Sequence, residues 1–456
     1  MRTRLIVALV LALLLAACGD DGGVFSTLPT GAGESTTTIG AVTSSSEGPA
    51  TSTTTEAATT TTEAATTTEA ATTTEAATTT TTLPAEPVWM WVADDGSFSG
   101  PDDQGMLDVA VGGPGLVAVG YDYSGGDGDA AAWASGDGSV WARMGHDEVV
   151  FGGEGDQEMN AVVAGGPGFV AVGWESLEES DAAVWTSRDG LAWTRLPHDE
   201  AVFGGYCHQF MKDVVVAGPG LVAVGGDCSH GDRDAAVWVS ADGLAWSRVA
   251  HDAAVFGGGD EQGMESVALG PAGLVAVGYD YSGGDWDAAV WVSADGLTWS
   301  RVAHDEAVFG GADDQEMWSV AASPAGVVAV GYDDSGGDRD GAVWLSLDGL
   351  SWSRAADDEA VFGGADGQEM ASVVITASGP VVVGDDESGG NWDAAVWVSA
   401  DGLAWSRVPH DRRVFGGAGN QSMWAVTAAG STVVAVGETG GGDDWDAAVW
   451  LRRPAG

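Results

Sequence analysis

Carboxylates and glycines recur together at one kind of loop in this sequence. In one copy, Asp280, Asp285 and Asp287 surround the pair Gly283-Gly284. Ca²⁺ binds about six to eight oxygen ligands, commonly at flexible turns, so these carboxylates are candidate calcium ligands, although their order matches no calcium-loop motif. Two other interpretations stay open: an acidic surface that keeps the protein in solution, and a docking surface for a cationic partner.

Two cysteines lie next to histidines in two separate loops. Cys207 precedes His208, and Cys228 lies two residues before His230. Outside the cytoplasm such cysteines form disulfides, and we expect a Cys207–Cys228 bond. A zinc site made by both cysteines and both histidines is the alternative. The histidines that recur along the chain are interpreted as loop hydrogen-bonding residues: His146, His198, His251, His304 and His410.

The third cysteine, Cys18, follows an apolar run from Leu5 to Ala17 that is preceded by two arginines. This arrangement is typical of an export signal. The segment Leu15-Ala16-Ala17-Cys18 resembles a bacterial lipobox. The resemblance implies a lipoprotein signal peptide over residues 1–17, lipidation of Cys18, and attachment to the extracytoplasmic face of a bacterial cell membrane. An ordinary secretory signal, with Cys18 incidental, is the alternative.

Residues 18–87 predict a disordered tether. The segment is dominated by Thr, Ala, Glu and Ser, and it has no aromatic residue between Phe25 and Trp89. Apolar burial therefore cannot compensate the entropy lost on ordering. A threonine-rich stalk of this kind is also a candidate for O-linked sugar.

Net charge excludes one class of partner. The chain has 68 acidic and 16 basic residues, for a formal net charge of -52. Such a field repels nucleic acids, whose binding requires neutralisation of phosphates. Hydrophobic residues make up 45% of the chain, enough to build a globular core. From residue 88 onward there are 59 acidic and 14 basic residues.

Residues 88–456 contain one unit written seven times. Its most regular marker is the tryptophan of the segment Asp-Ala-Ala-Val-Trp and its variants, spaced 52 or 53 residues apart. The copies are Trp133, Trp185, Trp238, Trp291, Trp344, Trp397 and Trp450. A fixed period of this length indicates a repeat architecture.

Each unit predicts four short antiparallel strands. In one unit these are residues 265–269, 274–278, 287–293 and 297–302, which are apolar or β-branched runs bounded by glycine or proline. Four strands per repeat, with no helical period, indicate the blade of an all-β propeller. A β-solenoid is the alternative, but its repeats are usually shorter and it needs end caps.

The ends of the chain predict how the ring closes. The last unit stops after its third strand, at residues 446–452, whereas residues 88–95 align with a fourth strand and its sequel at residues 245–252. The N-terminal strand should therefore complete the last blade, which removes an open sheet edge. We predict a seven-bladed β-propeller, with three strands of the last blade from one terminus and one from the other.

The turn between the third and fourth strands reads Ser-x-Asp-Gly-x-x-Trp in six units. Its aspartates are Asp137, Asp189, Asp242, Asp295, Asp348 and Asp401. This pattern resembles the Asp-box, or bacterial neuraminidase repeat, of sialidases and related propellers. The expected role of these aspartates is structural: the carboxylate accepts turn N–H groups, glycine supplies the unusual φ, and tryptophan packs below.

The resemblance also implies a sialidase site, which the residues do not favour. Sialidases hold the substrate carboxylate with three arginines near the axis, beside a tyrosine nucleophile paired with glutamate. Here six arginines instead share one slot on the outermost strand, where we expect ion pairs: Arg143, Arg195, Arg248, Arg301, Arg354 and Arg407. No tyrosine lies on a predicted innermost strand, and the one strong interruption of the repeat is the expected disulfide.

The sequence therefore favours a membrane-anchored extracytoplasmic lipoprotein whose acidic propeller is a binding or scaffolding module rather than an enzyme. Its partner would be a protein, a cationic ligand or a glycan, and we expect a monomer. A sialidase-like, glycan-active hydrolase is the alternative. No catalytic residue and no cofactor other than Ca²⁺ is predicted.

Overall fold

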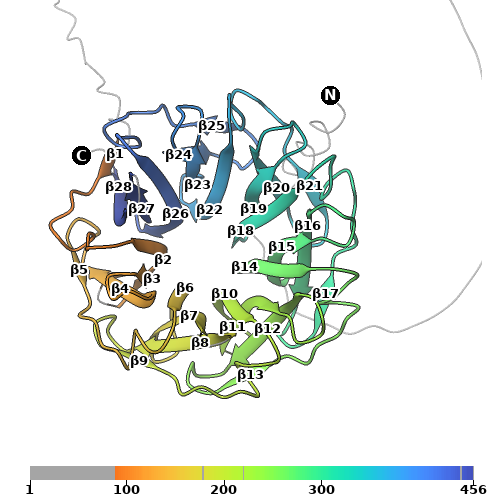
Figure 1. The fold of residues 1–456 in the computed structure, drawn as a ribbon. Helices are drawn as coiled ribbons and strands as arrows, with labels where there is room; N and C mark the ends of the chain where they lie inside the picture. Colours follow the sequence, from red (N-terminus) through yellow and green to blue (C-terminus); the bar gives the residue numbers. More distant parts are fainter. Residues whose placement is uncertain (1–87, 114, 177–178, 219, 442–443, 455–456) are drawn as a thin grey trace, which may run out of the picture. The chain divides into compact units, whose positions relative to one another are not determined.

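The computed structural model describes residues 88–456 apart from 114, 177–178, 219, 442–443 and 455–456. The predicted signal peptide, Cys18 and the predicted tether lie outside the described residues. The described residues form seven four-stranded antiparallel sheets arranged in a ring, which confirms the seven-bladed propeller (Figure 1). Within the same residues, no helix is long and apolar enough to cross a membrane.

Blades one to seven follow the chain, and in each the first strand is innermost. The innermost strands are β2 (Gln104–Gly112), β6 (Gln157–Gly165), β10 (Gln209–Ala217), β14 (Gln262–Gly270), β18 (Gln315–Ser323), β22 (Gln368–Thr376) and β26 (Asn420–Ala429). The second strands are β3 (Gly115–Asp122), β7 (Gly168–Ser176), β11 (Gly220–Asp227), β15 (Gly273–Asp280), β19 (Gly326–Asp333), β23 (Gly379–Asp386) and β27 (Thr432–Gly440).

The third and fourth strands form the outer half of each blade, and the outermost strand is the shortest. The third strands are β4 (Asp129–Ser135), β8 (Ser180–Ser187), β12 (Asp234–Ser240), β16 (Asp287–Ser293), β20 (Asp340–Ser346), β24 (Asp393–Ser399) and β28 (Trp445–Arg453). The outermost are β5 (Trp141–Arg143), β9 (Trp193–Arg195), β13 (Trp246–Arg248), β17 (Trp299–Arg301), β21 (Trp352–Arg354), β25 (Trp405–Arg407) and β1 (Val88–Trp91).

Strand boundaries differ from the prediction at the two sides of a blade. In blade four the innermost strand is longer than expected, because it begins at Gln262 rather than at residue 265. The outermost strand is shorter, because only Trp299 to Arg301 pair with β16. Leu297 belongs instead to the turn, where its N–H is bound by the Asp295 carboxylate at 2.9 Å.

The predicted ring closure is confirmed. β1 pairs antiparallel with β28, with Val88 opposite Arg453 and Trp91 opposite Trp450. The sheet order in this blade is β1-β28-β27-β26. Trp89 is buried in the same hydrophobic cluster as Trp450, so the N-terminal strand contributes core as well as hydrogen bonds.

The cores lie between neighbouring blades. One cluster joins Val117 and Ala132 of blade one to Met159 and Trp185 of blade two. Another joins Val434 and Val449 of blade seven to Met106 and Trp133 of blade one, so the apolar packing is continuous across the closure. Blades are therefore held together by shared cores rather than by cores of their own.

We predict that deleting residues 88–95 destabilises the whole propeller. The deletion removes buried Trp89 and Val92 and exposes the edge of β28. Loss of one buried tryptophan alone costs about 3–5 kcal/mol. The measurement is thermal unfolding of the full chain and of the deletion variant. A control deletion of eight residues within 60–79 should leave the melting temperature unchanged, and equal melting of all three proteins would contradict the closure.

Candidate functional site

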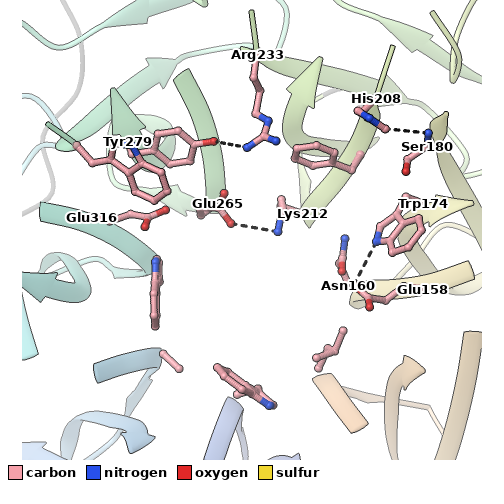
Figure 2. Close-up of a pocket in the computed structure, with 16 residues that line it drawn as sticks. Glu158, Asn160, Trp174, Ser180, His208, Lys212, Arg233, Glu265, Tyr279 and Glu316 are labelled. Carbon is pink, nitrogen blue, oxygen red and sulfur yellow. Dashed lines mark hydrogen bonds and ion pairs between the residues drawn. The ribbon is translucent and has the colours of Figure 1, made fainter. Parts of the chain in front are cut away.

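A cavity of about 660 Å³ opens among the innermost strands at the propeller axis (Figure 2). Each innermost strand carries a methionine at the same position of the repeat: Met106, Met159, Met211, Met264, Met317, Met370 and Met423. Every blade contributes to the cavity wall the residue that directly follows this repeat methionine. These residues are Leu107, Asn160, Lys212, Glu265, Trp318, Ala371 and Trp424. The same backbone position therefore lines the cavity in every blade, but it carries six different residue types, because tryptophan occurs twice.

A β-bulge explains why this position lines the cavity. In each innermost strand of the described blades, the register shifts immediately after the methionine, for example between Met211 and Asp213 or between Met317 and Ser319. The extra residue is left without a partner on the second strand, and bulges of this kind redirect a side chain. The methionine itself is fully buried between blades.

Three further positions of the repeat also reach the cavity. The residue before the methionine supplies Glu158, Phe210 and Glu316; the second strand supplies Trp174 and Tyr279; the residue before the first aspartate of the third strand supplies Ser180, Arg233 and Trp286. In the other blades these positions carry residues that are not part of the cavity wall, such as Gly105 and Trp392. Positions at which the repeats differ therefore meet around one cavity.

Blade three provides the positive charge of the cavity. Lys212 and Arg233 lie over the Phe210 ring, with the charged groups 5.5 and 5.0 Å from its centroid. The Lys212 ammonium is 3.7 Å from a Glu265 carboxylate oxygen, and Glu265 raises the lysine pKa. Arg233 donates a hydrogen bond of 3.1 Å to the Tyr279 hydroxyl. Both cations remain charged and face the same space (Figure 2).

Carboxylates lie on both sides of this basic group. Burial, with the nearby Glu265 charge, raises the pKa of Glu316 to about 7. The Tyr332 hydroxyl donates to Glu316 at 3.2 Å. On the other side, the Trp174 indole donates to Glu158 at 3.2 Å, and burial raises the pKa of Glu158. The cavity therefore offers aromatic faces, two cations and carboxyl groups, and burial raises the pKa of two of these, Glu316 and Glu158.

The six outer-strand arginines form ion pairs, as expected, but with partners farther inside the blade. Five pair with the aspartate that ends the second strand, namely Asp122, Asp227, Asp280, Asp333 and Asp386. Arg195 pairs with Glu175 at 3.1 Å. Among the described residues, Arg233 is the one arginine that lines the cavity, so the three-arginine arrangement of sialidases is not assembled there.

Asp280 is already engaged by protein groups. Its carboxylate pairs with Arg301, and it accepts hydrogen bonds from Gln262 at 2.8 Å and from the Ser282 backbone at 2.9 Å. Asp287 instead lies beside His304 and Glu306, and burial raises its pKa to about 6. Asp285 is the remaining member of the candidate set. Calcium binding by these three residues stays a prediction.

The Ser-x-Asp-Gly-x-x-Trp turns have a structural geometry. In blade two, Asp189 accepts the N–H groups of Leu191 and Ala192 at 2.9 and 3.0 Å, and Gly190 has a φ of +75°. The Trp193 indole donates to the Gly190 carbonyl at 3.2 Å. The carboxylates at 137, 242, 295, 348 and 401 likewise accept an N–H of their own turn, so they hold hairpins and do not enter the axial cavity.

The expected disulfide is confirmed. Cys207 and Cys228 are bonded, with their Cα atoms 5.6 Å apart. The alternative zinc site using both cysteines is therefore wrong, because the two sulfurs are consumed by the bond. His208 instead lines the axial cavity, where its Nδ1 accepts the Ser180 N–H at 3.1 Å.

Sequence reasoning missed the axial cluster. The disulfide was expected to be the one strong interruption of the repeat, and the structure corrects this: unlike residues meet at the axis. The signal was present in the sequence, because the residues on either side of the invariant methionine differ between units. These residues meet at the axis because of the β-bulge after the methionine, and the sequence pattern did not predict that bulge.

Comparisons with known proteins return solved structures only. No family model and no curated protein matches the chain. A protein of unknown function from Dyadobacter fermentans is 13% identical, with 82% of this chain and 99% of that one covered and a TM-score of 0.45. Sqt1 from Chaetomium thermophilum is 12% identical, with coverage of 81% and 100% and a TM-score of 0.44.

A Trypanosoma rangeli sialidase in complex with the inhibitor DANA is also similar, at 16% identity and a TM-score of 0.41. The match covers 65% of this chain and spans about half of the sialidase, 56% of its length.

We predict that Glu316 makes stability depend on pH. Its folded pKa of about 7 is above the unfolded value, so the folded state binds more protons between about pH 4.5 and 7. Stability should fall as pH rises through this window, by at most about 1.4 kcal/mol per pH unit for one group. Other buried carboxyl groups, such as Asp108 with a pKa raised to about 7, contribute to the slope as well. Glu316→Gln should therefore make the slope smaller by the contribution of this one group, as measured by urea unfolding from pH 5 to 8. The control is Glu306→Gln at an exposed carboxylate; parallel curves for Glu316→Gln and the unchanged protein would contradict the assignment.

Proposed function

We propose that the propeller is a ligand-binding module and that the axial cavity is its binding site. The observation that carries the proposal is the convergence of the divergent repeat positions on one cavity. Core positions of the repeat, such as the methionine and the third-strand tryptophan, are shared by all blades. A scaffold that needed only stability would have no reason to assemble Lys212, Glu265 and Trp318 around one space.

A glycan is the ligand class that fits the cavity best. Its volume is within the range of about 300–1,000 Å³ for small-ligand sites. Trp174, Trp286, Trp318 and Trp424 offer aromatic faces, whose negative quadrupoles attract the C–H groups of a sugar ring. Lys212, Arg233 and Asn160 donate hydrogen bonds, and the glutamates accept them from hydroxyl groups. This chemistry suits a ligand that is apolar on its ring faces and polar at its edges.

A glycan-active hydrolase is the second candidate. The observation that favours it is the pair Glu316 and Glu265 in one cavity. A carboxyl group with a pKa near 7 can serve as a general acid, and Glu265, which pairs with Lys212, would be the second carboxylate that glycoside hydrolysis requires. Tyr332 is not a favourable nucleophile, since burial and the Glu316 charge raise its pKa. Binding without turnover is therefore the primary proposal.

Binding can be tested with an array of neutral, amino and acidic oligosaccharides, followed by calorimetry with the best-bound sugar. We predict that Trp318→Ala weakens its binding at least about tenfold, equivalent to about 1.4 kcal/mol. The matched control is Trp392→Ala, which removes a partly exposed tryptophan outside the cavity wall and should leave affinity unchanged.

The outcomes separate the candidates. Retained sugar without new reducing ends supports a binding module, whereas release of reducing ends that is lost in Glu316→Gln supports the hydrolase. Equal affinities in Trp318→Ala and Trp392→Ala would place the site elsewhere, and an array with no bound sugar would reject a glycan ligand.

We further propose that Cys18 carries a lipid that holds the module on the outer side of a bacterial membrane. The support is the arrangement of Arg2 and Arg4, the apolar run and Leu15-Ala16-Ala17-Cys18. Two or three acyl chains bind a bilayer stably because each buried CH₂ contributes about 0.8 kcal/mol.

Cys18→Ser should therefore abolish incorporation of radiolabelled palmitate and should shift the protein out of the membrane fraction or leave it unprocessed. Cys207→Ser, which removes a disulfide cysteine, is the control and should keep the label. Palmitate label that persists in Cys18→Ser would contradict the lipid anchor.

A further inference from the structure

Blade three departs from the other blades in the loop between its second and third strands. His230 occupies the position that is glycine in four other blades, at Gly125, Gly283, Gly336 and Gly389. A second change affects the segment after the outermost strand. His251 belongs to the histidine series shared by several units, but Ala253 replaces the glutamate found two residues after this position in blades one, two, four and five.

These changes bring two imidazoles together. The rings of His230 and His251 are stacked, with centroids 3.8 Å apart and planes inclined by 14°. The carboxylate of Asp234, the first residue of β12, lies 3.4 Å from His251 Nε2 and is buried. One ligand atom from each of the three residues lies within 4.8 Å of the others.

The equivalent groups in other blades differ in donor type. In blade four, His304 lies beside Asp287 and Glu306, with 3.2 Å between its Nε2 and the Glu306 carboxylate. Blade two has the same set in Asp181, His198 and Glu200. Among the described residues, the blade-three cluster is the one in which a second imidazole replaces that carboxylate.

We propose that His230, Asp234 and His251 bind a divalent transition-metal ion, with Zn²⁺ as its representative. Two imidazole nitrogens and one carboxylate oxygen form a donor set that zinc prefers, with a water able to complete a tetrahedron. Ligand atoms around zinc are about 2.0–2.2 Å from the metal, hence about 3.3–3.6 Å from one another. Closing from at most 4.8 Å requires a shift of roughly 1 Å. One of the stacked rings must also rotate so that the lone pairs of both imidazoles point at the metal, and the partly exposed His230 can make both movements.

Neighbouring contacts support this position. Cys228 lies two residues before His230 and is bonded to Cys207, so the loop that carries the second imidazole is fastened to its neighbour. The Asp227 carboxylate, which also pairs with Arg248, is 3.9 Å from His230 Nδ1. This is beyond hydrogen-bond distance, but its negative charge favours a cation at the cluster. Arg233, which lines the axial cavity, directly precedes Asp234, so a bound metal would fix the backbone beside the basic wall of that cavity.

The test is calorimetric titration of the full chain, stripped of metal by chelation, with ZnCl₂ in buffer containing excess Mg²⁺. The magnesium occupies the acidic surface, because hard cations prefer oxygen ligands to imidazole. We expect one saturable zinc site per chain. His230→Gly, which restores the residue of the other blades, should weaken it at least about 100-fold, since even loss of a residue that only orients a ligand costs about 10–100-fold.

The matched control is His304→Ala in blade four, which removes the one imidazole of its cluster and should leave zinc binding unchanged. Asp234→Asn provides a second variant, and metal-free thermal unfolding checks that each variant folds. Equal zinc affinity in His230→Gly and the unchanged protein would overturn the proposal. The absence of a saturable site, or displacement of zinc by an equal concentration of Ca²⁺, would overturn it as well.

Discussion

The hydrogen bond from each third-strand tryptophan to the loop before its blade holds the propeller together. Trp185 donates its indole N–H to the Val150 carbonyl at 2.6 Å, and Trp238 donates to Val202 at 2.8 Å. The same bond recurs in the other described blades. These indoles are fully buried, where an unpaired N–H would cost about 1–3 kcal/mol. A repeat can therefore satisfy its largest core side chain only when the preceding loop is in place, which couples every blade to the one before it.

The residues that stabilise the ring are different from the residues that line the axial cavity. The third-strand tryptophan, the innermost-strand methionine and one phenylalanine of each inter-blade loop, such as Phe151 or Phe309, fill the cores between blades. All three recur in every unit. Asp213 and Ser266 add a direct tie, since each side chain accepts an N–H from the innermost strand of the next blade, at Val267 and Val320. The bulged residue that follows the methionine is not part of these cores. Where its side chain ties neighbouring blades, it does so by polar contacts, as from Asn160 to the Met211 carbonyl at 2.8 Å. The bulged residue can change from lysine to tryptophan without disturbing the ring, and it is the residue that faces the axis.

The fold could be predicted from the sequence because each structural signal recurs in every repeat. A strict period, four strand-like runs per unit and an N-terminal fragment aligning with the absent fourth strand together predicted both the architecture and its closure. The sequence did not predict the site because Met211 and Lys212 are adjacent in the same strand. The bulge after Met211 directs the Lys212 side chain to the axial cavity, whereas Met211 packs in the core between blades. Positions that are identical in most repeats proved to be structural. Asp295 holds a turn, and Arg301 pairs with Asp280. The functional candidates are the positions where the repeats disagree.

Charge places a further constraint on what the axial cavity can bind. Around Lys212 and Arg233 the cavity is locally basic, yet the propeller carries 59 acidic residues against 14 basic ones. A polyanion would be repelled by the long-range field before it reached the two cations, whereas a neutral or zwitterionic molecule would not. Screening reduces that field beyond a Debye length of about 8 Å at physiological salt, while the partly buried pair of Lys212 and Glu265 is screened less. A neutral ligand with apolar ring faces and polar edges is therefore compatible with both the acidic long-range field and the residues of the cavity wall.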